Sequence, residues 1–543
     1  MSKDAKAETV LHTAPEGGQL QRKLQARHLE MIAIGGTIGT GLLLRSGSAI
    51  ARSGPLGALM CFAIVGLQVF GVASGIGEMA TLLPVEGAFS AFPTRFVNKP
   101  LGFVNGWNYW LVWALTFPAE MAGIAGLMAF WFPDVKSYIW SFVYVFPFVG
   151  INLITVTGFA EVEFVLCIVK IFAIVLFLII GSLYWFGVGH SDGFLGFRNW
   201  KPAIVGSDGL DSFLRIGGTF TTAFFSYGGT ELVGLTAGEA ANPRMSVPRA
   251  INGTFWRILI FYIGSIFLVG VILPTDSPVL VQKSSSMSPF VYAYKAVGIS
   301  FASHFMNLVI IVAASSAANS ALYACARTLM RLAEEGSAPS MFAKVSKRGI
   351  PVNSVMAVTV ISLIAVAVAY LAEIGGDGKG SGKVFDWLSG VISYGIMANW
   401  MVMSFTHLRF RYGYLSQGRK MEDLPYIAPF FPYADYVSLF IGAFVTAFMF
   451  VAAFYNSTNE AEFFSTQWFL DKSWIYFTIP LLIVMYIGKG LVSGGFTFIT
   501  YDQMDFETGR LIETEAEKAE NEAMKDRPKG MAAWAKRVWF KLF

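Results

Sequence analysis

The chain has 543 residues, of which 55% are hydrophobic and only 14% are charged, and its formal net charge is +4. Soluble domains carry about a quarter charged residues, so this composition argues against a soluble protein with buried helices. The small net charge says little by itself, whereas its distribution along the chain is informative.

Long apolar runs predict twelve membrane-spanning helices. A bilayer core of about 30 Å is crossed by roughly 20 apolar residues in an α-helix. Lipid offers no partners for free backbone groups, so every span is expected to be helical. The predicted spans start near Met31, Leu56, Phe103, Tyr138, Val162, Phe213, Phe255, Phe301, Val352, Val391, Tyr436 and Ser473. We therefore predict an all-α membrane protein.

The first predicted span contains a cluster of glycines, Gly35, Gly36, Gly39 and Gly41. Each glycine costs about 1 kcal/mol relative to alanine in a helix interior, so the cluster predicts an unwound segment inside the span. Unwound backbone at this depth is tolerated only where it is buried in protein or lines a cavity. The alternative is a continuous helix that packs closely against a neighbour through its small residues.

Ionisable residues occur inside several predicted spans, where they are costly and therefore candidates for function. Glu120 lies in the third span, and burial disfavours the charged form of a carboxyl, so this side chain can hold a proton. Lys170 lies about two turns into the fifth span, where an ammonium could replace a bound metal cation. Glu78, near the end of the second span, is expected to reach the interface or to form a structural ion pair.

The sixth predicted span repeats the feature of the first, with Gly228 and Gly229 between Phe225 and Glu231. A matching pair of glycine-broken spans, one and six, predicts two inverted repeats of five spans. Exposed N–H groups at the start of a half-helix attract a carboxylate, and exposed carbonyls at a half-helix end attract an ammonium. An amino acid carries both groups on one carbon, so two facing breaks are a natural receptor for it. For Glu231, as for Glu120 and Lys170, we expect a functional role ahead of a purely structural ion pair.

Basic residues gather in alternate loops, which by the positive-inside rule predicts that both termini are cytoplasmic. The basic loops hold Arg22, Lys23, Arg27, Arg95, Lys99, Arg244, Arg249, Arg327, Arg331, Lys344, Lys347, Arg348, Arg409, Arg411, Arg419 and Lys420. We expect a cytoplasmic N-terminal tail over 1–28, a twelve-span domain over 29–495 and a cytoplasmic C-terminal tail over 496–543.

The sequence predicts no metal and no cofactor. The three cysteines lie inside predicted spans, and the five histidines show neither metal-binding nor catalytic spacing. The stretch 378–383 reads GKGSGK but lacks the first glycine and the Ser or Thr of a phosphate-binding loop. We therefore expect neither an enzyme nor transport driven by ATP.

Several stretches resemble the amino-acid permeases of the amino acid–polyamine–organocation superfamily, and most closely the fungal amino-acid permeases and the bacterial lysine permeases. The sixth-span stretch that begins GTELVG at 229 is the most specific of them, and DFETG at 505–509 is more similar to the fungal proteins. The remaining matches are 26–41, 106–110, 316–320 and 423–426. The resemblance covers roughly residues 20 to 510 and implies a leucine-transporter-like fold of 5+5 inverted repeats with broken helices 1 and 6.

The resemblance also implies roles for individual residues. Thr40 and Gly41 match positions that receive the substrate carboxylate, and the carbonyls of Thr37 and Gly228 match positions near its ammonium. The intervening Ile38 and Gly39 belong to the same unwound segment, and Phe225 matches an aromatic gate over the substrate. Glu120 and Lys170 match proposed proton-coupling positions, to which we add Glu231 because it follows the break.

The expected function is proton-coupled uptake of L-amino acids across the plasma membrane by alternating access. The expected partners are an amino-acid substrate, the proton and membrane lipid, without nucleic acid. Two alternatives stay open: an amino-acid sensor with little transport, which the short tails disfavour, and a polyamine permease. A polyamine lacks the carboxylate that the first-span amides would bind.

Overall fold

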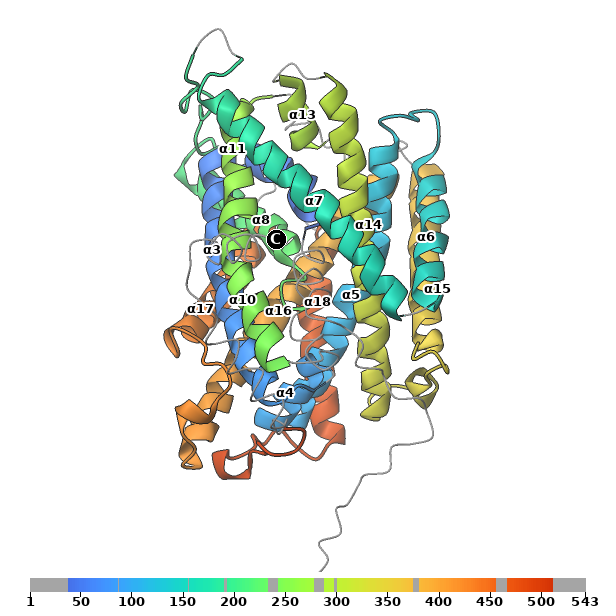
Figure 1. The fold of residues 1–543 in the computed structure, drawn as a ribbon, viewed down its shortest axis with the longest axis vertical. Coiled ribbons are helices and arrows are strands. Elements are labelled where there is room, and N and C mark those ends of the chain that lie inside the picture. Colours follow the sequence, from blue (N-terminus) through green and yellow to red (C-terminus); the bar gives the residue numbers. More distant parts are fainter. Residues whose placement is uncertain are drawn as a thin grey trace, which may run out of the picture.

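The computed structural model describes residues 38–85, 87–154, 156–189, 193–232, 243–277, 288–296, 300–374, 380–455 and 466–510. Within these ranges every regular element is a helix and there is no strand. Figure 1 shows the helices running together as one elongated bundle, with α7 crossing its front at an angle. The all-α prediction is therefore confirmed for the described part of the chain.

The longest elements form the body of the bundle. They are α3 (Ser46–Leu82), α5 (Lys99–Met128), α6 (Ser137–Ile154), α7 (Val156–Trp185), α8 (Gly209–Tyr227), α14 (Ser300–Glu334), α15 (Val352–Ile374), α16 (Gly380–Ser416), α17 (Tyr433–Tyr455) and α18 (Thr466–Val492). Shorter elements are α2 (Thr40–Leu43), α4 (Ala88–Phe96), α10 (Pro243–Arg257), α11 (Gly264–Ile272) and α13 (Pro289–Ala296). A π-helical turn, η2 (Ile258–Ile263), joins α10 to α11, and single 3₁₀ turns η3 (Ser340–Ala343), η4 (Met421–Asp423) and η6 (Tyr501–Gln503) lie in connections.

Seven described helices are long and apolar enough to cross a membrane: those within α3, α5, α7, α14, α15, α16 and α17. Three shorter apolar helices cover residues 137–153, 258–272 and 477–492. The predicted span that starts near Met31 begins outside the described residues, and α8, which holds Phe213, is not among the seven. The structure thus supports a multi-pass membrane protein, and the number twelve stays a prediction.

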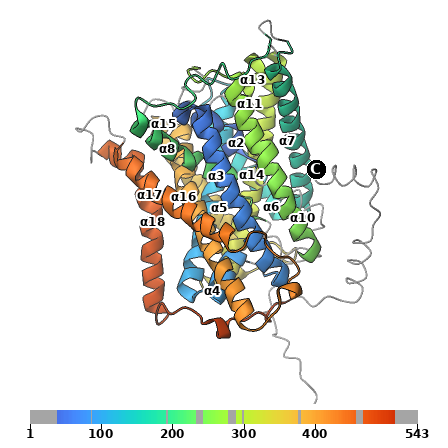
Figure 2. The ribbon, with the colours of Figure 1, turned by 90° about the vertical axis from the view of Figure 1, so that its left-hand side faces the viewer.

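The bundle has an inner and an outer set of helices. The apolar windows of α5, α14 and α16 are about four-fifths buried, whereas those of α7, α15 and α17 are 39% buried. A helix that is apolar on all sides and still exposed needs an apolar solvent. The inner set therefore forms the protein core, and the outer set leaves much of its apolar surface exposed. In Figure 2, α18 lies along one outer edge of the bundle.

Helix α13 and helix α4 mark opposite ends of the bundle in both views (Figures 1 and 2). At the α4 end, residues 496–510, which we call the C-terminal strap, return across the bundle after α18. The Ile499 amide donates to the Val97 carbonyl at 2.8 Å. Phe506 is 1% exposed, and its ring packs against Phe96 and Phe410 at centroid distances of 5.4 and 5.5 Å. The strap is therefore part of the folded domain.

A group of four buried charged side chains, which we call the end cluster, joins α3 to α16 and α17. Glu78 accepts from Arg411 Nε at 2.7 Å and from the Ala428 amide at 2.6 Å. His407 Nδ1 lies 2.8 Å from Asp435 Oδ2, and its Nε2 lies 3.4 Å from Glu78 Oε1. All four side chains are buried. Of the two roles expected for Glu78, the structure supports the ion pair, because the carboxylate does not reach the interface.

Candidate functional site

The first-span break is visible on its described side. Gly39 is extended, with φ −131° and ψ −154°, and α2 starts only after it, at Thr40. This helix lasts four residues and is completely buried. The amides at the start of a helix have no acceptor within the helix, so the backbone here offers N–H groups inside the protein. Thr37, Gly35 and Gly36 lie outside the described residues.

The sixth-span break is equally local. Helix α8 ends at Tyr227, and the Gly228 amide caps it by donating to the Phe224 carbonyl at 3.1 Å. Gly229 then takes a positive φ of 98°, a conformation that strongly favours glycine. The Gly229 amide donates to Glu231 Oε2 at 3.1 Å. Glu231 therefore binds the backbone of the break itself, and the signature residues from 233 to 242 lie outside the described residues.

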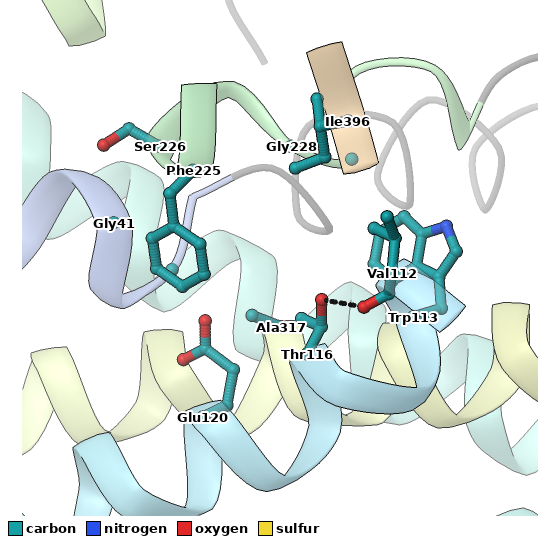
Figure 3. A pocket seen from close by; sticks show the side chains of 12 residues that line it. Gly41, Val112, Trp113, Thr116, Glu120, Phe225, Ser226, Gly228, Ala317 and Ile396 are labelled. Carbon is teal, nitrogen blue, oxygen red and sulfur yellow. Dashed lines mark hydrogen bonds between the residues drawn. The ribbon is translucent and has the colours of Figure 1, made fainter. Parts of the chain in front are cut away.

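The two breaks touch each other without an intervening side chain. A Cβ atom on Gly41 would lie 2.6 Å from the Cα of Ser226, and one on Gly39 would lie 2.9 Å from the Cβ of Ala317. Real Cβ atoms do not approach other atoms so closely, so glycine is required at both positions for this packing. Ser226 turns its hydroxyl away and donates to Thr222 O at 2.7 Å (Figure 3). Close packing and unwinding, which the sequence left as alternatives, occur together here.

A cavity of about 30 Å³ lies where the breaks meet α5, α14 and α16 (Figure 3). It has room for a few water molecules rather than for an amino acid, so its walls must separate before a larger ligand can bind. The walls are mainly apolar apart from one carboxyl group. They are formed by Gly39, Gly41, Val112, Trp113, Thr116, Glu120, Phe225, Ser226, Gly228, Gly229, Ala317 and Ile396.

Glu120 supplies the charged group of this cavity from α5. Its Oε1 accepts from the Thr40 hydroxyl at 3.0 Å, which ties the carboxyl to the first break. Its Oε2 is buried and has no hydrogen-bond partner within the described ranges. Figure 3 shows the carboxyl group pointing toward the ring of Phe225. A buried polar atom without a partner is costly, so this oxygen has an open position for a proton or a ligand donor.

Lys170 lies behind the first break. Its ammonium is completely buried; it donates to the Ile38 carbonyl at 3.2 Å and to Ser316 Oγ of α14 at 2.6 Å. Glu163 Oε1, two turns earlier on α7, lies 3.9 Å from Lys170 Nζ and accepts from the Ser316 hydroxyl. We call Thr40, Glu120, Glu163, Lys170 and Ser316 the central cluster.

Glu163 and Ser316 are the members of the central cluster that the sequence analysis did not predict as site residues. Glu163 is the second residue of the span predicted to start near Val162. The spacing to Lys170 is seven residues, or two helical turns, which places both side chains on one face of a helix. That spacing is the signal that could have identified the pair.

Phe225 covers the cavity on the side where α16 begins. Its ring meets Phe385 edge to face at 5.8 Å, and the Arg45 guanidinium lies 5.9 Å from its centroid. Arg45 also pairs with Asp386 at 3.3 Å and donates to Ser389. This layer of rings and charges separates the cavity from the exposed end of α16.

The described helices define a multi-pass membrane protein with a buried cavity between two broken helices. The chain belongs to the amino acid permease family, whose model matches residues 28–493. The resemblance predicted from the motifs is therefore confirmed, and because this family consists of permeases, so is the expectation that the chain is not an enzyme.

Curated relatives cover most of the chain. The lysine-specific permease LysP of Lactococcus lactis subsp. cremoris (strain MG1363) is 40% identical over 87% of this chain and 90% of its own length. The histidine permease HisP of the same strain is 38% identical, over 87% and 94%. The general amino-acid permease GAP1 of Saccharomyces cerevisiae (strain ATCC 204508 / S288c) is 35% identical, over 90% and 80%.

Proposed function

We propose that this protein takes up L-amino acids together with protons across the plasma membrane by alternating access. The observation that carries the proposal is the direct contact between Gly41 and Ser226 beside the buried Glu120. It joins two broken backbones and one titratable group at a single cavity. The names of the relatives, which are lysine, histidine and general amino-acid permeases, support an amino acid as cargo.

The proposed architecture has twelve spans in two inverted five-span repeats, with both termini in the cytoplasm. Ten apolar helices are described, seven long and three shorter, and the first and sixth spans would complete the set. The basic loops support the orientation. The surrounding apolar helices α7, α15 and α17 would face membrane lipid.

In the proposed binding mode, the substrate carboxylate lies against the amides of Thr40 and Gly41, next to Ile38 and Gly39. The substrate ammonium lies against the carbonyls of Thr37 and Gly228. Oppositely charged groups of one small molecule would then hold both broken spans together, and Phe225 would close over them. This mode is favoured over a polyamine, which has no carboxylate for the first-span amides.

Proton coupling is assigned to Glu120 and Lys170, with Glu231 as a third candidate. Glu120 lines the cavity and contacts the first break, and Lys170 holds Ile38 from the other side. Glu231 binds Gly229, so its charge supports the backbone of the sixth break. A proton that crosses the full membrane potential gains about 2.3 kcal/mol per 100 mV, enough for about fifty-fold accumulation of a neutral substrate.

The test is uptake by the purified protein in liposomes with an acidic exterior and a negative interior. A symporter accumulates labelled amino acids above the external concentration, and a protonophore abolishes the accumulation. A sensor binds the same amino acids without accumulating them. Competition by a panel of amino acids and polyamines then identifies the cargo, and accumulation of polyamines alone would overturn the proposal.

A further inference from the structure

One more buried carboxyl group, Glu163, lies outside the set used for the proposed coupling mechanism. Glu163 and Lys170 are both fully buried on α7, with 3.9 Å between Oε1 and Nζ. An ammonium in the membrane interior is costly unless an opposite charge compensates it. Glu163 is the carboxylate of the described residues that pairs with it within 4 Å.

Ser316 connects the two charges by hydrogen bonds whose directions are fixed by chemistry. A lysine ammonium can only donate and a carboxylate can only accept. Ser316 Oγ therefore accepts from Lys170 Nζ, at 2.6 Å, and donates its own proton to Glu163 Oε1. The result is a continuous chain from nitrogen through hydroxyl to carboxylate.

We propose that Glu163 and Lys170 act through Ser316 as one proton-holding unit of the transport cycle. This inference rests on the proposed symport and adds a residue and a charge state to it. Glu163 supplies the negative charge that makes the loaded unit electrically neutral inside the membrane.

The proton balance is simple. When Lys170 passes a proton to Ser316 Oγ and Ser316 passes its own proton to Glu163 Oε1, the pair of charges becomes a neutral amine and a neutral acid. No proton is gained or lost in that step. Release of the proton from Glu163 to water leaves the unit with a charge of −1, and uptake of a proton restores neutrality.

The surroundings of Glu163 can stabilise the unit after it has released its proton and carries a charge of −1. Glu163 Oε2 has no direct hydrogen bond to the described residues, and the polar side chains of Asn319 and Ser320 lie close enough to interact with the carboxylate. The titratable groups that act on Lys170 besides Glu163 are Cys167 of α7 and Glu120 of α5.

The unit is also linked to the substrate site through the backbone. Lys170 donates to the Ile38 carbonyl at 3.2 Å, directly before the first break. A hydrogen bond from an ammonium is about twice as strong as one from a neutral amine. Deprotonation of Lys170 therefore loosens the segment that carries Gly39 and Gly41, which couples proton release to the substrate site.

The experiment compares two activities of the full-length protein in liposomes: accumulation driven by a proton gradient, and exchange of internal for external amino acid without a gradient. Accumulation by the unaltered protein is measured first, and its absence would refute the proposed symport rather than this inference. In Glu163→Gln we expect accumulation to fall about ten-fold or more, while exchange falls less than about three-fold. Glu161→Gln, an exposed carboxyl two residues earlier on the same helix, is the matched control and should retain both activities.

A double variant separates coupling from a structural ion pair. Lys170→Met alone strands a buried carboxylate and should reduce both activities. Glu163→Gln/Lys170→Met removes both charges and should exchange substrate faster than Lys170→Met alone, but it should not accumulate substrate. If the double variant accumulates substrate like the unaltered protein, or if Glu163→Gln leaves accumulation unchanged, the pair is structural and the proposal is wrong.

Discussion

The protein buries two groups of charged side chains, and they are bonded very differently. In the end cluster both oxygens of Glu78 are occupied, by Arg411 and by the Ala428 amide. In the central cluster Glu120 and Glu163 each have one oxygen without a hydrogen-bond partner among the described residues. Both clusters lie within the apolar bundle, where an unsatisfied polar atom costs about 1–3 kcal/mol.

The difference lies between individual carboxyl groups: Glu78 holds the fold with both oxygens bonded, whereas Glu120 and Glu163, like Asp435 of the end cluster, each have one oxygen without a hydrogen-bond partner among the described residues. A carboxylate with all its bonds made fixes two helices to each other and has little reason to change protonation. A carboxyl with an open oxygen can accept a proton or a ligand donor without breaking an existing bond. Burial alone does not distinguish the two roles, because Glu78 and Glu163 are equally buried.

The largest effect is expected from the end cluster. Arg411→Leu leaves Glu78 buried without its bidentate partner, and breaking such a pair costs about 3–5 kcal/mol. We expect loss of most folded protein, measured as thermal stability of the detergent-solubilised protein by size-exclusion chromatography after heating. Arg348→Leu, on an exposed loop arginine, is the control and should change stability by less than about 0.5 kcal/mol. Normal stability of Arg411→Leu would show that the end cluster has no structural role.

The central cluster should show the opposite behaviour. Glu120→Gln keeps an oxygen that can accept from Thr40 but can no longer exchange a proton. We expect nearly normal stability and the loss of proton-driven accumulation, a fall of up to about fifty-fold at 100 mV, with exchange retained. Glu422→Gln, which changes an exposed carboxyl in η4, should accumulate substrate normally. Unchanged uphill uptake by Glu120→Gln would show that the assigned coupling role is wrong.

The contact between the breaks allows a steric test of the proposed substrate site. Gly41→Ala places a methyl group 2.6 Å from Ser226 Cα, so the two backbones must move apart. We expect amino-acid affinity, measured by binding of labelled substrate in detergent, to fall about ten-fold, which corresponds to 1.4 kcal/mol. Gly253→Ala adds the same methyl group in α10, where nothing lies within 4 Å, and should bind normally. Equal affinities in the two variants would show that the contact between the breaks does not contribute to substrate binding.

The smallest effect belongs to a surface ion pair between Glu507 of the C-terminal strap and Arg419, which follows α16. The hydrogen bond from Arg419, 2.6 Å long, holds the pKa of Glu507 below its usual range. Folding lowers the pKa of Glu507. The contribution of this ion pair to folding stability is therefore fully present above the unfolded pKa and is lost as pH falls through the folded pKa. Glu507→Gln should lower stability by less than about 1 kcal/mol at pH 7. The difference in Tm between the two proteins should shrink as pH falls below the unfolded pKa and vanish below the folded pKa of Glu507, and a constant difference would contradict this origin.

Local sequence patterns predicted the parts of the site that depend on backbone conformation. The sixth break at Gly228 and Gly229, the extended Gly39 and the buried positions of Glu120 and Lys170 could be read from glycine clusters and from charges in apolar runs. These signals are local because a glycine cluster in a helix and a charge in an apolar run can be recognised in the sequence without knowing their partners.

Contacts between distant helices could not be read in the same way. Nothing in the sequence pairs Glu78 with His407 and Arg411, which are more than 300 residues away, or joins Lys170 to Ser316. The cavity and its apolar wall depend on how α5, α14 and α16 pack around the breaks. The first span is described only from Ile38 onward, so Thr37 remains a prediction.

The C-terminal strap has a practical consequence for producing the protein. Phe506 fills a ring cluster with Phe96, Phe410 and Tyr414, and Gln417 donates to the Tyr501 and Met504 carbonyls at 2.9 and 2.8 Å. A truncation after Val492 would uncover these rings and leave the side-chain donors of Arg95, Arg409 and Gln417 without their acceptors in the strap. Fluorescent fusions and affinity tags should therefore be joined after Arg510, where the strap has made its contacts.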